Sequence, residues 1–94
     1  MAGKTKESFR VNLRKQARNR PCQVRIAGVC DGGGETTVLA HYRLAGTCGT
    51  GRKPPDLLGA WCCGPCHAAV GDRGHDLAEG VMRTIAQLSA EGLL

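Results

Sequence analysis

The 94-residue sequence has few aromatic side chains, no long apolar run and almost no acidic charge in its first fifth. Only Phe9, Tyr42 and Trp61 are aromatic, whereas 14 residues are glycine, so the chain has little material for a hydrophobic core. A single small domain of this kind usually needs a covalent or metal staple. No run is long enough to cross a membrane, and no apolar segment follows the first residues, so we expect a cytoplasmic protein.

Six cysteines offer candidates for the staple. A reducing cytosol disfavours disulfides and favours metal binding, and four thiolates make a closed structural zinc site. Cys48 could take the place of Cys30 in such a site, and Cys62 is expected to pack away from the metal. The expected zinc ligands are the C-x-x-C knuckle and a wider pair closed by a glycine turn, namely Cys22, Cys30, Cys63 and Cys66.

The run WCCGPCH at 61–67 is the densest group of metal-capable side chains, and several interpretations fit it. C-G-P-C beside a tryptophan is also typical of thioredoxin-type redox sites, but residues 52–56 are turn-like and no proline follows Pro65. C-x-x-C-H is also the haem-attachment pattern, which implies export. A knuckle that only supports the fold, with His67 solvated, stays open. We favour a zinc knuckle whose following helix directs His67 toward a surface groove.

Positive charge is concentrated in residues 1–20, which carry seven basic side chains against Glu7, whereas the other 74 residues carry six against seven. A basic arm on a near-neutral body is typical of proteins that bind DNA or RNA, and a solvated arm that only aids solubility is the alternative. We therefore divide the chain into a basic arm, 1–20, and one zinc-containing domain, 21–94. The candidate nucleic-acid-binding residues are Arg10, Arg14, Lys15, Arg18 and Arg20 in the arm, and Arg43, Arg52 and Lys53 in a glycine-rich loop.

Residue patterns predict two strands and three helices. Alternation and β-forming residues predict strands over 22–26 and 36–42, with His41 near the end of the second strand. Apolar spacing predicts helices over 9–18, over 65–70 and from Asp76 to about residue 91. Asp76 and Glu79 form a D-x-x-E start signal for the last helix. Gly80 inside that helix costs up to ~1 kcal/mol relative to alanine.

The order of cysteines and histidines resembles the HNH nucleases of the ββα-metal (His-Me finger) class. In that pattern a cysteine pair, a histidine and C-x-x-C-H follow one another, as do Cys22…Cys30, His41 and residues 63–67 here. The similarity extends to LAHYRL at 39–44, CGTG at 48–51 and KPPD at 53–56. Over nearly all residues after 12, the chain resembles the small phage and prophage proteins of the YbcO nuclease family.

This resemblance implies hydrolysis of phosphodiester bonds in a bacterial host. His41 would act as general base on a water molecule, and His67 would bind Mg²⁺ or Mn²⁺, which stabilises the leaving 3′ oxygen. The chain departs from the HNH pattern at Ala40, where an acidic metal ligand often precedes the base, and it has no asparagine between His41 and the knuckle. Asp56 and His75 are therefore candidates for a further ligand of the catalytic ion.

The expected fold is small α+β, with a zinc-stapled ββα-metal (HNH-like) core, an N-terminal basic arm and a C-terminal helix. The expected function is metal-dependent endonuclease cleavage of double-stranded DNA, with structural Zn²⁺, catalytic Mg²⁺ or Mn²⁺ and no small-molecule cofactor. The alternative is a non-enzymatic zinc module that binds nucleic acid or a replication or recombination partner. His41 and His67 distinguish the two, because a pure binding module does not need both.

Overall fold

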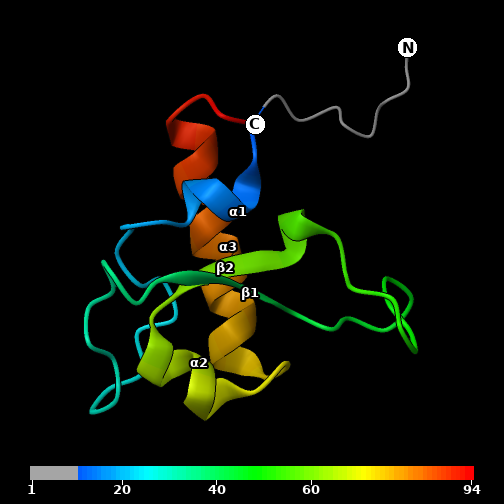
Figure 1. The fold of residues 1–94 in the computed structure, drawn as a ribbon, viewed down its shortest axis with the longest axis horizontal. Coiled ribbons are helices and arrows are strands. Elements are labelled where there is room, and N and C mark those ends of the chain that lie inside the picture. Colours follow the sequence, from blue (N-terminus) through cyan, green and yellow to red (C-terminus); the bar gives the residue numbers. More distant parts are fainter. Residues whose placement is uncertain (1–10) are drawn as a thin grey trace.

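The computed structural model describes residues 11–94, which form a small α+β fold around a two-stranded sheet (Figure 1). Arg10, and the part of the first predicted helix that includes Phe9, lie outside the described residues. Within this range no helix combines the length and apolar character needed to cross a bilayer. The elements in chain order are α1 (Leu13–Gln16), β1 (Val38–His41), the 3-10 helix η2 (Asp56–Leu58), β2 (Gly59–Cys62), α2 (Gly64–Val70) and α3 (His75–Ala90).

The sheet consists of β1 and β2 in antiparallel register. Ala40 pairs with Ala60 and His41 pairs with Gly59. Side chains alternate between the two faces of a strand, so His41 lies on the same face as Leu39. Trp61, which pairs with Leu39 across the sheet, lies on that face too. The two faces bury separate apolar clusters: the Ala40 face packs with the cysteines, Leu77 and Val81, and the Trp61 face packs with Leu13, Ala17 and Leu88.

Helix α3 contributes to both clusters and crosses the sheet in Figure 1, with α1 above the strands and α2 below them. Leu77 and Leu88 of α3 are almost completely buried, one in each cluster. The backbone N–H of Trp61 donates to the buried hydroxyl of Thr84 at 2.9 Å, which fastens β2 to α3. Because every residue of β2 is buried, this strand forms the centre of the molecule.

Helix α1 spans only four residues, shorter than the predicted helix over 9–18. The side chain of Asn12 accepts hydrogen bonds from the N–H groups of Arg14 and Lys15, so Asn12 caps the helix and fixes where it begins. Asn19, with φ of 61°, turns the chain away soon after the helix ends. Leu13 and Ala17 are buried against Trp61, so this part of the basic arm belongs to the folded body.

The strand predicted over 22–26 is wrong. This segment bends at residues 23–24, and Arg25 adopts a positive φ of 60°. Gln23 makes a single backbone bond to the sheet, from its N–H to the carbonyl of Trp61 at 2.7 Å. The following N–H groups of Arg25 and Ile26 point instead at cysteine sulfurs. Cys22, Gln23 and Val24 are all buried, so the alternation of apolar and polar residue types in the sequence does not correspond to two faces of a strand.

The predicted start of the last helix is also wrong by one residue. Helix α3 begins at His75, its N-cap residue is Gly74 with φ of 110°, and no side chain caps it. Asp76 lies within the first turn, where its charge suits the positive end of the helix dipole. In contrast, α2 begins at Gly64 with Pro65 in its first turn, close to the prediction.

Candidate metal cluster and basic cleft

Four cysteine sulfurs gather at the N-terminal end of α2. The Sγ atoms of Cys22, Cys30, Cys63 and Cys66 all lie within 4.8 Å of one another, and those of Cys30 and Cys63 are 3.9 Å apart. Four sulfurs about 2.3 Å from a tetrahedral zinc ion would be roughly 3.8 Å apart, so the group has the size of a zinc site. All four are free thiols, and they can hold a structural metal such as zinc.

Each of the four sulfurs also accepts a backbone N–H. The donors are Arg25, Gly32, Cys66 and Ile26, at 3.3 to 3.5 Å from Cys22, Cys30, Cys63 and Cys66 respectively. Such bonds stabilise the negative charge that thiolates carry when they bind metal. Burial alone would raise the pKa of Cys22, but N–H donors led by Arg25 lower it to about 7. This donor set fits zinc, as expected from the C-x-x-C motif.

The two remaining cysteines lie outside the cluster. Cys30 rather than Cys48 completes the set of four; the thiol of Cys48 instead donates to the carbonyl of Leu44 at 3.6 Å. Cys62 is fully buried in the apolar core, as expected for a neighbour of Cys63 on an extended approach. Burial raises the pKa of Cys62 to about 12. Cys62 is therefore an inert core thiol.

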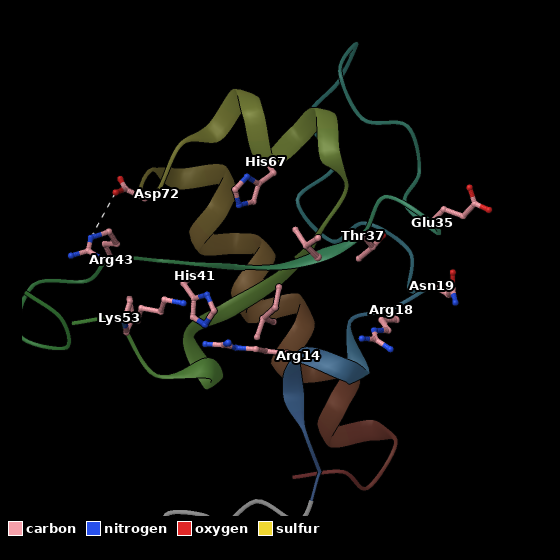
Figure 2. Close-up of a pocket in the computed structure, with 13 residues that line it drawn as sticks. Arg14, Arg18, Asn19, Glu35, Thr37, His41, Arg43, Lys53, His67 and Asp72 are labelled. Carbon is pink, nitrogen blue, oxygen red and sulfur yellow. Dashed lines mark ion pairs between the residues drawn. The ribbon is translucent and has the colours of Figure 1, made fainter. Parts of the chain in front are cut away.

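A cleft of about 820 Å³ lies between α1, β1 and α2. Figure 2 shows His67 projecting into it from α2 and His41 from the end of β1, with Arg14 below them. Basic side chains border both of its ends. The lining residues are Arg14, Arg18, Asn19, Glu35, Thr37, Val38, Leu39, His41, Arg43, Lys53, Pro54, His67 and Asp72.

His41 is held by Asp56, which lies in η2. Nε2 of His41 is 2.8 Å from Oδ1 of Asp56, and Nε of Arg14 is 3.3 Å from the same oxygen. The His41 side chain is 18% exposed, so its ring is largely fixed but accessible from the cleft. Burial would raise the pKa of Asp56, but the hydrogen bond from His41 and the charge of Arg14 together hold it below its usual value. The carboxylate is therefore ionised at neutral pH.

His67 has no second metal-binding side chain from the predicted pair. Asp56 bonds to His41 and does not line the cleft, and His75 pairs with Glu79 at 3.0 Å on the exposed side of α3. Within residues 11–94, the four-cysteine cluster is the one group of three or more side chains close enough to share a metal. The structure thus brings His41 and His67 into one cleft without Asp56 or His75 as ligands beside them.

The predicted nucleic-acid-binding residues other than Arg10, which lies outside the described residues, fall into three groups. Arg14, Arg18, Arg43 and Lys53 line the cleft, whereas Lys15 and Arg52 are exposed outside its lining. Arg20 is used inside the protein: its guanidinium makes two bonds to Glu91, at 2.6 and 2.7 Å, and lies 4.4 Å over the ring of Trp61. We therefore leave Arg20 out of the proposed binding surface.

Sequence reasoning missed Asp72 as a cleft residue and Asp56 as the partner of His41. Asp72 follows α2, and its carboxylate lies 3.8 Å from Nε of Arg43, as drawn in Figure 2. The carbonyl of Asp72 also accepts the N–H of Arg43 at 2.9 Å. Spacing gave no signal for either pair, because each joins residues that are far apart in the sequence and meet only in the fold.

Comparison with known proteins places the chain in a family. The family model described as "Putative nuclease YbcO" matches residues 11–93. The chain belongs to the YbcO family. Two YbcO relatives of that description, from Escherichia coli K12 and from Enterobacteria phage 82, are each 53% identical to it over 75 residues, which are 80% of this chain and 78% of the relative.

A solved structure supports the fold. A structure described as that of "a putative bacteriophage protein" from Escherichia coli K-12 MG1655 matches this one with a TM-score of 0.69 and 41% sequence identity, covering 86% of this chain and 100% of that one. The YbcO resemblance predicted from the sequence is confirmed. The YbcO description also agrees with the predicted class of enzyme and with the phage connection.

Proposed function

We propose that this YbcO-family chain is an HNH-type, metal-dependent endonuclease that cleaves double-stranded DNA and is stapled by a structural zinc ion. The observation that carries the proposal is the cleft itself: His41 at the end of a strand and His67 in the helix after the knuckle line it together. Their order along the chain, and their places at the end of a strand and in the following helix, support the proposal of a ββα-metal site. The cysteine cluster would keep α2, and hence His67, in place beside the sheet.

The proposed chemistry divides between the two imidazoles. His41 takes a proton from a water molecule that attacks the phosphorus, a role in which a general base contributes typically 10²- to 10⁴-fold to the rate. His67 is the residue that would hold Mg²⁺ or Mn²⁺, which when bound stabilises charge on the phosphate and on the leaving 3′ oxygen. His67 is exposed at its site in α2, so a ring nitrogen can face the cleft.

The basic side chains suit a phosphodiester backbone. Arg18 lies toward one end of the cleft, and Arg43 and Lys53 toward the other, with the histidines between them (Figure 2). Contacts of this kind position a polyanion without reading its sequence. We therefore propose that the cleft holds phosphates on both sides of the bond to be cut.

The second candidate is a zinc module that binds nucleic acid without cutting it. It is favoured by the small number of ligands near His67, since only the cysteines form a metal-sized group among the described residues. A cation held by one imidazole must take its remaining ligands from water and from substrate phosphate. Magnesium commonly binds in that way, with few protein ligands.

The deciding experiment compares His41→Ala, His67→Ala and the matched control His75→Ala in plasmid cleavage with Mg²⁺ or Mn²⁺. His41→Ala should lose roughly 10²- to 10⁴-fold in rate at every metal concentration. His67→Ala should also lose activity, but partly regain it as the metal concentration rises, because it weakens binding of the ion. His75→Ala should cleave like the wild type, since His75 lies outside the cleft lining.

Zinc content, melting and DNA affinity are measured for all four proteins, so that loss of cleavage is not confused with unfolding. A wild-type chain that never nicks or cuts would overturn the nuclease and leave the binding module. Equal cleavage by His41→Ala would remove His41 as the base.

A further inference from the structure

The His41 ring has an asymmetric environment. Its Nε2 lies 2.8 Å from a carboxylate oxygen of Asp56, which is the one partner of this ring among the hydrogen bonds of residues 11–94. An ionised carboxylate can only accept a hydrogen bond, so a neutral imidazole at this position must carry its proton on Nε2. Nδ1 then keeps its lone pair, and it is the nitrogen that can accept a proton.

We propose that Asp56 is a positioning residue that holds His41 in the Nε2–H tautomer, so that Nδ1 is the atom that takes the proton from water. This inference rests on the proposed function, because it assigns the reacting atom within that site. When the proton moves from water to Nδ1, the imidazole becomes a cation and the Asp56 carboxylate stabilises it. The hydroxide formed attacks the phosphorus as the bond to the 3′ oxygen breaks.

Asp56 is itself held from a second direction. Nε of Arg14 donates to the same Oδ1 at 3.3 Å. Arg14 follows Leu13, which is 5% exposed and anchors α1 in the apolar cluster that contains Trp61. Asp56 opens η2 directly after Pro55, which has an extended backbone, and η2 leads straight into β2. Orientation of the base therefore depends on a contact between segments 42 residues apart.

The same contacts argue against Asp56 as a ligand of the catalytic ion, the role considered from the sequence. Its Oδ1 receives hydrogen bonds from both His41 and Arg14, and Arg14 supplies a full positive charge. A cation bound there would have to displace one donor and sit beside the guanidinium. The carboxylate already bonds to an imidazole and a guanidinium, and Asp56 does not line the cleft.

The experiment reads the tautomer directly. Long-range ¹H–¹⁵N spectra of the zinc-loaded full chain are recorded at alkaline pH for wild type, Asp56→Asn, Asp56→Glu and the control Asp76→Asn, with the His41 signals assigned by their loss in His41→Gln. Wild type and Asp76→Asn should show the proton on Nε2. Asp56→Asn should lose that preference, because an amide can donate or accept, whereas Asp56→Glu should restore it at least in part.

Cleavage kinetics accompany the spectra. Asp56→Asn should lower kcat by roughly 10²- to 10⁴-fold with KM little changed, since the orientation of a base matters in the transition state. A wild-type proton on Nδ1, or unchanged tautomer and kcat in Asp56→Asn, would overturn the inference. If the wild-type chain cleaves nothing, the proposed function fails, and the spectra alone decide whether Asp56 fixes the tautomer.

Discussion

Gly80 lies where α3 closely approaches Val24 and Ala60. A Cβ atom at this position would lie 2.7 Å from Cγ2 of Val24 and 3.3 Å from Cβ of Ala60. Val24 is buried and β-branched, so its side chain has few other rotamers to adopt. Gly80 lowers the helix propensity of α3, but the close packing of the helix against Val24 and Ala60 requires a residue without a side chain.

Replacing Gly80 with alanine should destabilise the protein despite the better helix propensity of alanine. The helix gains up to about 1 kcal/mol, whereas overpacking a core costs typically 1–3 kcal/mol, so we expect a net loss of about 1 kcal/mol in the free energy of unfolding. Denaturant unfolding of the zinc-loaded chain measures it. Ser89→Ala, at an exposed position of the same helix, is the control and should be neutral or slightly stabilising.

A double-mutant cycle with Val24 tests whether a steric clash causes the loss of stability in Gly80→Ala. The double variant Gly80→Ala/Val24→Ala should lose less stability than the sum of the two single variants, because the shortened valine makes room for the new methyl group. Additive effects would mean that the two positions do not compete for the same space.

Among individual residues, the sequence predicted those whose role follows from a local motif. The knuckle cysteines and the position of His67 follow from C-G-P-C-H, since Cys63 caps α2 and the helix carries the next residue outward. The partnership of Asp56 with His41 could not be predicted, because it depends on how η2 folds over the end of β1. The role of Arg20 could not be predicted either, because its partner Glu91 lies 71 residues away in the sequence.

At the scale of elements, the contact between Arg20 and Glu91 joins the segment after α1 to the end of α3. The two carboxylate oxygens of Glu91 receive one hydrogen bond each from Arg20, and Gln87 adds a third bond at 2.8 Å. These bonds, led by the one from Arg20, lower the pKa of Glu91 to about 2. Arg20 also covers the indole of Trp61, so this pair closes the Trp61 face of the core.

Glu91→Gln should lower the melting temperature at neutral pH, with a pH dependence that identifies the carboxylate. A depressed pKa means that the stabilising effect is complete above the ordinary value of 4.5 and is lost as pH falls toward about 2. The difference in Tm between wild type and Glu91→Gln should therefore be constant from pH 8 to 5 and shrink below that. Acid release of metal affects both proteins, so the difference isolates the ion pair.

A second variant tests geometry rather than charge. Arg20→Lys keeps the positive charge but cannot form two parallel bonds or stack flat on Trp61, and it should lower Tm about as much as Glu91→Gln. A lysine variant as stable as wild type would show that charge alone matters here.

The helices and strands could be predicted where apolar residues recur at the spacing of one face of the element. Strand β1 and helices α2 and α3 were found near their predicted places. Strand β2 was not predicted, because Gly59–Cys62 is buried throughout and so shows no alternation of polar and apolar residues. The segment 22–26 was mistaken for a strand because its residue types alternate. The N–H groups of Arg25 and Ile26 bond to cysteine sulfurs instead of a neighbouring strand, and no local pattern reveals this.

At the scale of the whole molecule, the basic cleft should make binding of DNA depend on salt. Arg18→Ala and Lys53→Ala should each reduce the slope of log K against log salt by about 1, with similar loss of affinity for unrelated sequences. Arg73→Ala removes an equal charge from an exposed site outside the cleft lining and should leave the slope near that of wild type. Fluorescence anisotropy across a salt series measures all four proteins.

The cysteine cluster ties together two parts of the chain that are far apart in sequence, 22–30 and 63–66. A structural zinc ion contributes roughly 10–16 kcal/mol of apparent binding energy, as much as the total stability of a typical domain. Chelation, or Cys66→Ser, should therefore abolish the cooperative melt. Cys48→Ser is the matched control and should keep one zinc per chain by elemental analysis. A metal-free chain that melts like the loaded one would contradict the zinc staple.

The six thiols differ in their accessibility to an alkylating reagent, so the pattern of labelled cysteines depends on whether the protein is folded and holds its metal. Cys48 is half exposed, four thiols are engaged by the proposed zinc, and Cys62 is buried with a pKa raised to about 12 by that burial. Alkylation should then advance in two steps: Cys48 in the loaded protein, and the four ligands together with Cys62 once the ion leaves and the chain unfolds. Mass spectrometry of the labelled chain would separate the two populations, and molecules in which Cys62 alone stays unlabelled would mean that β2 remains closed without the metal.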